Sequence, residues 1–134
     1  MDRRWILVAL GGALGAIARY ALAGLIKRAG ALPYGTLAVN VLGSLLIGFF
    51  LGHELLAAEA AHDWRLFLVP GFLGAFTTFS AFSYETFALL AKNDFHLAGL
   101  NIALNLSLGL AGVWVVSLWL AVRVVERREY VLDQ

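Results

Sequence analysis

The chain has 134 residues, of which 61% are hydrophobic and 14% are charged, and its formal net charge is +1. A soluble domain of this size needs a far more polar surface, so the composition predicts an integral membrane protein. The near-neutral charge argues against a nucleic-acid partner, and the absence of cysteine excludes disulfides and thiolate metal sites.

Four apolar runs, separated by short polar segments, are each long enough to cross a bilayer as a helix. They predict a single all-α transmembrane domain over residues 1–134, with spans at about 5–26, 35–56, 66–90 and 97–122. A cleaved signal peptide is the alternative interpretation of the first run. That run continues past Arg19 as far as Ile26, which a cleaved signal would not need. We therefore expect a multi-pass protein of the cell (inner) membrane.

Small and polar residues share one face of each of the first two spans. In the first span, Gly11, Gly15 and Arg19 lie four residues apart, so a neighbouring helix can approach the glycines and the arginine lies on the same packed side. In the second span the shared face carries Thr36, Asn40, Gly43 and Ser44. Two interpretations stay open for this stripe: either Asn40 joins two helices by a hydrogen bond, or the whole stripe is a wall that faces something hydrated.

The third span contains a segment that a plain transmembrane helix would lack. Pro70, Gly71 and Gly74 weaken the helix, and the hydroxyls of Thr77 and Thr78 can bond to backbone groups that a break releases. We therefore predict a helix that is broken at mid-membrane. Non-helical backbone persists in lipid only where protein buries it or where it lines a hydrated or ion-filled cavity. The segment thus predicts a functional site.

Polar residues also follow one face of the fourth span, where Asn101, Asn105, Gly109 and Gly112 recur at helical spacing. Four helices cannot enclose a channel and also bury all of these polar groups, so we expect a dimer in which the polar faces meet. The sequence has no Walker loop, no nucleophile beside a base and no intramembrane set of metal-ligating residues. We therefore expect no catalytic residues and no enzyme activity.

Four spans place both termini on one side of the membrane. The basic residues expected on that side are Arg3, Arg4, Arg65, Arg123, Arg127 and Arg128, against Lys27, Arg28 and Lys92 on the other side. This bias favours cytoplasmic termini only modestly, so insertion in both orientations stays open.

Three stretches of the sequence carry a resemblance to a known family. They read GGALGAIARY at residues 11–20, GTLAVNVLG at residues 35–43 and GFLGAFTTFSAF at residues 71–82. In this order, in a short chain with four spans, they resemble the Fluc (CrcB) family of small fluoride channels. The match covers the first three predicted helices, and the fourth fits only loosely.

The resemblance implies an antiparallel, dual-topology homodimer that lets fluoride leave the cell passively through two pores. It also implies a structural sodium ion at the dimer centre, held by the backbone carbonyls of residues that match Gly74 and Thr77. Freed carbonyls are hard oxygen ligands, which suit a hard cation.

For the anion path, the resemblance implies two aromatic rings, an amide and a hydroxyl, at positions that match Phe79, Phe82, Asn40 and Ser80. The ring edges carry partial positive charge and the polar groups donate protons, so an anion can lose water without meeting a trapping charge. The pore wall or the dimer seam is expected to include Thr36, Arg19, Asn101, Asn105 and Glu85. The chain departs from the family pattern at Ala75, where a glycine is usual, and at Ala81, where a hydroxyl residue is usual.

Two other functions stay open. A small multidrug exporter also has four helices, but its proton coupling needs a carboxylate within the first helix. The first span here holds Arg19 and no acid, and Glu85 is the only candidate carboxylate. A non-transporting assembly subunit is the other alternative, but it would have no need of a broken helix.

Overall fold

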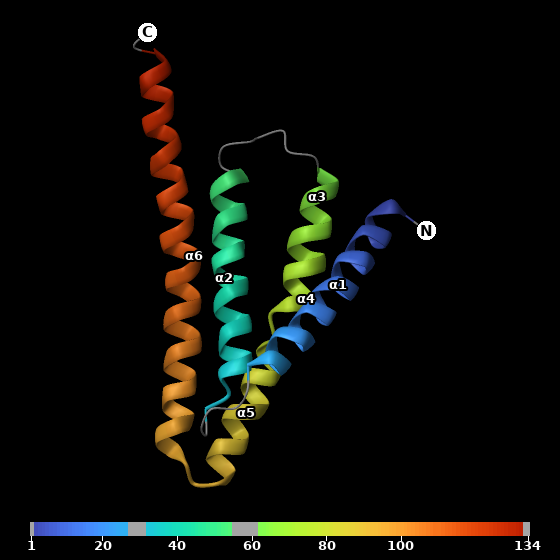
Figure 1. The fold of residues 1–134 in the computed structure, drawn as a ribbon, viewed down its shortest axis with the longest axis vertical. Coiled ribbons are helices and arrows are strands. Elements are labelled where there is room, and N and C mark those ends of the chain that lie inside the picture. The colour runs from blue at the N-terminus through green and yellow to red at the C-terminus, as the bar shows by residue number, and fades with distance from the viewer. Residues whose placement is uncertain (1, 27–31, 55–61, 133–134) are drawn as a thin grey trace.

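The computed structural model describes residues 2–26, 32–54 and 62–132, and every regular element in these ranges is helical (Figure 1). The long helices are α1 (Arg3–Leu25), α2 (Tyr34–Glu54), α5 (Phe79–Ala91) and α6 (Phe95–Leu132). Within the described residues, four segments are long and apolar enough to cross a membrane: Arg3–Leu25, Tyr34–Gly52, Asp63–Ala91 and Phe95–Arg123. The four predicted spans are therefore confirmed, with boundaries that differ by a few residues.

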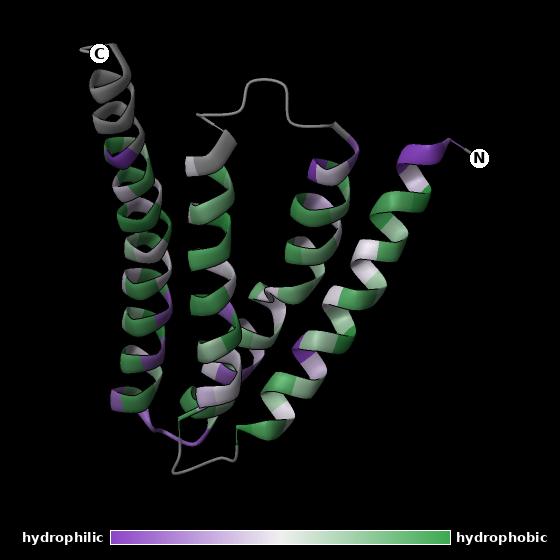
Figure 2. Ribbon diagram, turned by 45° about the horizontal axis from the view of Figure 1, so that its top comes forward, coloured by the Kyte–Doolittle hydropathy of each residue, from purple (hydrophilic) through white to green (hydrophobic). Residues whose placement is uncertain are grey.

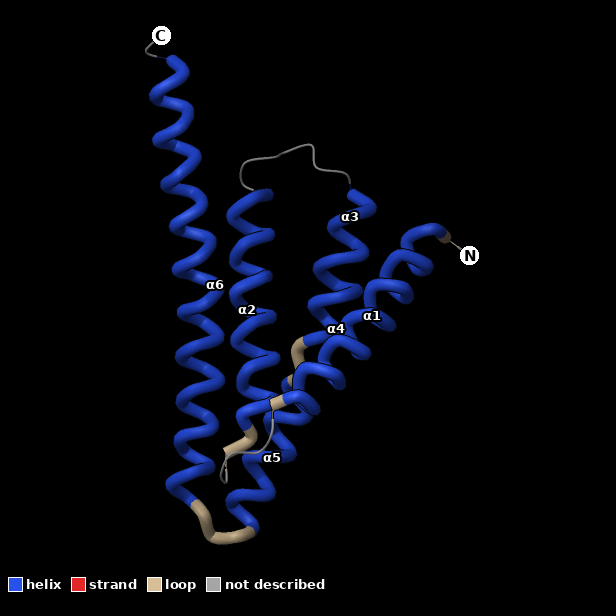
Figure 3. Tube along the Cα trace, viewed as in Figure 1, coloured by secondary structure: helices blue, strands red, loops and turns tan. Residues whose placement is uncertain are grey.

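The third span is interrupted before α5 by a short non-helical segment (Figure 3), and the part that precedes this segment is only partly α-helical. Helix α3 (His62–Leu66) leads into a π-helical stretch, η1 (Phe67–Leu73), which is followed by the short α4 (Gly74–Phe76) and then by α5. Pro70 lies within η1, where the wider turn accommodates a residue that has no N–H to donate. Between His62 and Ala91 the chain leaves helical geometry only at Thr77 and Thr78, whose ψ angles are 157° and 109°. The predicted break is confirmed, and it lies at the two threonines of the stretch 71–82, while Pro70 and Gly71 stay within η1 and Gly74 begins α4.

Glycines allow α1 to lie directly against the part of the third span that precedes the break. A Cβ atom on Gly11 would overlap the carbonyl oxygen of Phe67, and a Cβ atom on Gly15 would overlap that of Phe72. Only a residue without a side chain permits such close backbone contact. The predicted packing face of the first span is confirmed, and it seats α1 on η1 just before the break.

The outside of the bundle is apolar, as a lipid environment requires. Most residues of the helices are hydrophobic, and hydrophilic ones gather at the N-terminal end of α1 and at the α5–α6 turn (Figure 2). Trp114 and Leu110, for example, are 73% and 72% exposed. The residues buried within the chain, by contrast, include the polar side chains Thr36, Thr78, Thr86, Asn101 and Asn105. Polar groups inside and apolar groups outside are the arrangement of a membrane protein.

Both ends of the described chain lie at the same end of the bundle, opposite the α5–α6 turn (Figure 1). This is the arrangement that four crossings require. Helix α6 continues to Leu132, beyond the end of the fourth apolar segment at Arg123. Lys27 and Arg28, which enter the predicted charge bias, lie outside the described residues.

Candidate functional site

The candidate site is built around the break, where side chains replace the lost helical hydrogen bonds. In a continuous helix the N–H of Thr78 would bond to the carbonyl of Gly74, but here it donates to Oδ1 of Asn40, at 2.9 Å. Likewise the N–H of Ala81, which would bond to the carbonyl of Thr77, donates to the hydroxyl of Thr78, at 3.2 Å. Both exchanges release a carbonyl from the helical ladder. Gly74 and Thr77, the residues singled out as candidate cation ligands, are thus among the residues whose carbonyls lose their helical partners between α4 and α5.

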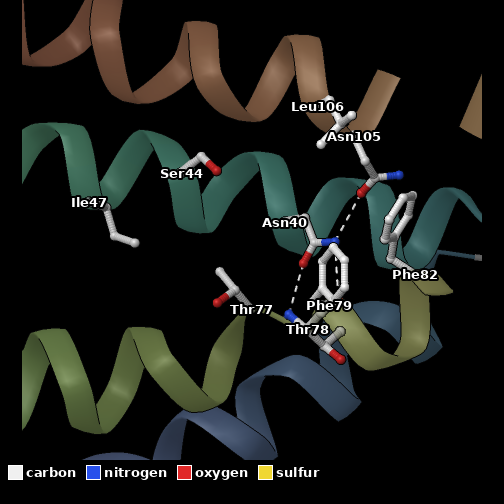
Figure 4. Close-up of a pocket in the computed structure, with 9 residues that line it drawn as sticks. All are labelled: Asn40, Ser44, Ile47, Thr77, Thr78, Phe79, Phe82, Asn105 and Leu106. Atoms are coloured by element: carbon white, nitrogen blue, oxygen red, sulfur yellow. Dashed lines mark hydrogen bonds between the residues drawn. The ribbon is translucent and has the colours of Figure 1, made fainter. Parts of the chain in front are cut away.

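Asn40 connects the break to the fourth span. Its Nδ2 donates to Oδ1 of Asn105 at 2.9 Å and, over a longer distance of 3.3 Å, to the carbonyl of Thr78. Figure 4 shows the Asn40 side chain between Thr78 and Asn105, with a dashed line to each. The interpretation of Asn40 as a residue that joins helices is therefore confirmed.

A pocket of about 240 Å³ lies beside these bonds, so the polar stripe of the second span also borders open space (Figure 4). It brings together the predicted pore residues Asn40, Phe79 and Phe82 with Asn105 of α6. None of its nine lining residues is ionisable; they are Asn40, Ser44, Ile47, Thr77, Thr78, Phe79, Phe82, Asn105 and Leu106. The pocket therefore offers amides, hydroxyls and aromatic rings, and no full charge.

The two phenylalanines of the pocket differ in exposure. Their ring centroids are 5.4 Å apart and their planes are inclined at 52°. Phe82 is 8% exposed and lies inside the chain, whereas Phe79 is 75% exposed. One ring is thus part of the interior of this chain, and the other is presented at its surface.

The remaining candidate residues lie around the pocket rather than in it. Ser80 is exposed, and its hydroxyl lies 3.2 Å from that of Thr78. Asn101 donates from Nδ2 to the hydroxyl of Thr86 at 2.9 Å and accepts at Oδ1 from Asn105 at 3.0 Å. The structure therefore places Asn101 behind Asn105, away from the lining.

Arg19, Thr36 and Glu85 come together on another side of the break. Thr36 donates its hydroxyl to Oε1 of Glu85 at 2.7 Å. Arg19 and Thr36 line a second cavity, of about 360 Å³, whose other walls include Thr78 and Ala81. Thr78 thus borders both cavities, with the phenylalanines on one side and the arginine on the other.

Sequence reasoning missed one member of this polar system, Thr86. Its hydroxyl donates to the carbonyl of Phe82 at 2.8 Å and accepts from Asn101. The available signal was spacing: Thr78, Phe82 and Thr86 follow one another at intervals of four and therefore share a helical face.

The chain also resembles known proteins over most of its length. Residues 6–117 match the family model described as CrcB-like protein, Camphor Resistance (CrcB). A protein of Geobacter sulfurreducens named fluoride-specific ion channel FluC is 49% identical over 111 residues, which cover 81% of this chain and 90% of the relative. A protein of the same name from Methanococcus maripaludis is 48% identical over 103 residues, covering 77% and 84%. Another, from Thermococcus onnurineus, is 42% identical over 110 residues, covering 82% and 89%.

Proposed function

Since this chain belongs to the CrcB-like family of membrane proteins, we propose that it is a fluoride-selective ion channel. The observation that carries the proposal is the name fluoride-specific ion channel, which is shared by relatives 42–49% identical over most of the chain. Passive flow down a gradient would let fluoride leave a cell in which it accumulates.

The chemistry of the pocket beside the break supports this function. An anion that enters a narrow site must lose water, and amide and hydroxyl protons together with aromatic ring edges can replace part of that hydration. The lining residues carry no full positive charge, so an anion would be held weakly enough to leave again. Asn40 has one N–H in a long bond of 3.3 Å to a carbonyl, and this is the donor for which fluoride would compete most easily.

A structural sodium ion fits the released carbonyls of Gly74 and Thr77. Backbone oxygens are ligands that hard cations prefer, and both groups have lost their helical N–H partners to side chains. Gly74 is exposed on the surface of a single chain, so a second copy would complete the ligand set. The ion would neutralise the negative ends of these carbonyl dipoles and would not move with fluoride.

The second copy would be another molecule of the same chain, arranged antiparallel. Phe79 is 75% exposed and Gly74 is exposed, so the break reaches a surface that a partner could cover. A homodimer would bury polar backbone that a single chain leaves near lipid.

Dual topology can be tested directly because the chain has no native cysteine. The substitution His96→Cys would introduce a single cysteine at an exposed position at the start of α6, near the α5–α6 turn. With a membrane-impermeant maleimide added to intact cells, an equal mixture of orientations predicts that about half of the chains are labelled. Labelling of all chains or of none would contradict dual topology.

Fluoride efflux tests the channel function itself. Purified protein in liposomes loaded with potassium fluoride should release fluoride to an external electrode once a potassium ionophore is added, while chloride-loaded liposomes retain chloride. No fluoride release would contradict the proposal. Release that requires a proton gradient would favour an exporter, although α1 carries no acidic residue in its first turn or anywhere else along Arg3–Leu25.

A further inference from the structure

A continuous ladder of side-chain hydrogen bonds links α5, α6 and α2 behind the pocket. Thr86 donates to the carbonyl of Phe82 at 2.8 Å, and Asn101 donates to the hydroxyl of Thr86 at 2.9 Å. Asn105 then donates to Oδ1 of Asn101 at 3.0 Å, and Asn40 donates to Oδ1 of Asn105 at 2.9 Å. We call Thr86, Asn101, Asn105 and Asn40 the amide ladder.

Both ends of the amide ladder fix the direction in which its bonds run. At one end, the backbone N–H of Thr78 can only donate, so the Asn40 atom facing it must be the oxygen. The Asn40 nitrogen must then point towards Asn105. At the other end, the Thr86 hydroxyl spends its only proton on the Phe82 carbonyl, so it can only accept from Asn101. The two ends require the same orientation of all three amides.

Water cannot easily take the place of a missing member of the ladder. Asn101 is 1% exposed, Thr86 is 8% exposed and Asn105 is 9% exposed, so their polar groups depend on protein partners, which for Asn105 also include the backbone carbonyl of Asn101, at 3.0 Å. If the hydroxyl of Thr86 is removed, Asn101 loses the bond that keeps its Nδ2 directed towards α5. The side-chain amide of Asn101 can then flip by 180° and present its Nδ2 to the Nδ2 of Asn105, which needs an acceptor.

We infer that Thr86 and Asn101 are positioning residues that hold the N–H groups of Asn40 in the orientation needed at the pocket. They act through Asn105, and neither of them lines the pocket itself. The inference rests on the proposed channel function, in which Asn40 offers a donor to fluoride. Because Thr86 also donates to the Phe82 carbonyl, the same ladder connects the backbone of Phe82, whose ring lines the pocket, to α6.

The test uses Thr86→Val, which keeps the shape of the side chain but removes the hydroxyl acceptor, and Thr86→Ser, which keeps the hydroxyl. A single interhelical hydrogen bond contributes modestly to the stability of membrane proteins, so both variants should fold. We expect fluoride efflux from liposomes to fall about tenfold in Thr86→Val, as for other residues that orient a ligand without touching it. Thr86→Ser should stay near the wild-type rate.

Ser117→Ala is the matched control. Ser117 also lies in a transmembrane helix and donates its hydroxyl to the carbonyl of Val113, four residues earlier, but it has no part in the ladder. Its loss should leave efflux unchanged. Wild-type efflux in Thr86→Val, or equally poor efflux in Thr86→Ser, would overturn the inference. Absence of efflux from the wild-type protein would instead contradict the channel function, so the two failures are distinguishable.

A measurement on the unmodified protein guards against a Thr86→Val variant that does not fold. The chain has four asparagines, and Asn93, at the exposed α5–α6 turn, lies outside the ladder. In protein labelled with ¹⁵N-asparagine, the ladder predicts slow hydrogen exchange at the side-chain amides of Asn40, Asn101 and Asn105 and fast exchange at Asn93. Fast exchange at Asn101 would show that the ladder does not persist, which contradicts the inference.

Discussion

Replacing Gly15 with alanine tests how the broken helix is held, because Gly15 touches the backbone just before the break. The added Cβ would lie 2.9 Å from the carbonyl carbon of Phe72 and nearer still to its oxygen. Carbon atoms in contact stay about 3.5–4.0 Å apart, so α1 and η1 would have to separate by about 1 Å. Overpacking of this kind costs about 1–3 kcal/mol. At roughly 4 °C per kcal/mol for a chain of this size, the apparent Tm should fall by about 4–12 °C.

Thermal unfolding of the purified protein in detergent, followed by tryptophan fluorescence, measures this loss. Gly99→Ala is the control, because a Cβ atom there meets nothing within 4 Å. Alanine is the better helix former by about 0.5–1 kcal/mol, so Gly99→Ala should be as stable as the wild type or slightly more stable. If Gly15→Ala had the same apparent Tm as Gly99→Ala, α1 would not lie against the Phe72 backbone and the reasoning would be refuted.

Three further predictions concern the pocket and the break. Phe79→Ile should leave folding intact, since Phe79 is 75% exposed. It should sharply reduce fluoride efflux, because the partial positive charge of the ring edge is lost. Undiminished efflux would show that the ring serves only in packing. Asn40→Asp keeps an oxygen acceptor for the backbone N–H of Thr78 but loses both N–H donors, so the protein should fold but should not release fluoride. Efflux at the wild-type rate would show that Asn40 is not part of the fluoride path. A Cβ atom at Gly74 meets only the carbonyl oxygen of Val69, at 3.7 Å, so the Gly74→Val chain should still fold. Light scattering should show that Gly74→Val no longer forms the dimer, whereas Thr77→Ser should remain dimeric. A dimeric Gly74→Val would place the interface elsewhere.

Local patterns in the sequence were enough to predict the spans, the packing face of α1 and the existence of the break. Hydropathy reports lipid exposure directly, and the spacing of Gly11 and Gly15 reports where backbones can touch. Both kinds of signal are contained within one helix, so they can be read without knowing which helices are neighbours.

The bonds that replace the helical ones at the break, and the amide ladder, could not be predicted in this way, because they depend on contacts between helices. The N–H of Thr78 is satisfied by Asn40, 38 positions away, and no pattern within the third span indicates this partner. Thr86 is one of several hydroxyl residues in α5, and it gains its role only because Asn101 of α6 lies against it. Sequence spacing shows which residues share a face, but it does not show which face of another helix they meet.

Recording currents from the protein in a planar bilayer tests the channel function most directly. With chloride equal on both sides and a tenfold gradient of fluoride, a fluoride-selective channel predicts a current that reverses about 59 mV from zero, the potential of a univalent ion on that gradient. The sign should follow fluoride, and replacing sodium by another cation on one side only should not shift it. A reversal potential near zero, with chloride carrying as much current as fluoride, would contradict the account.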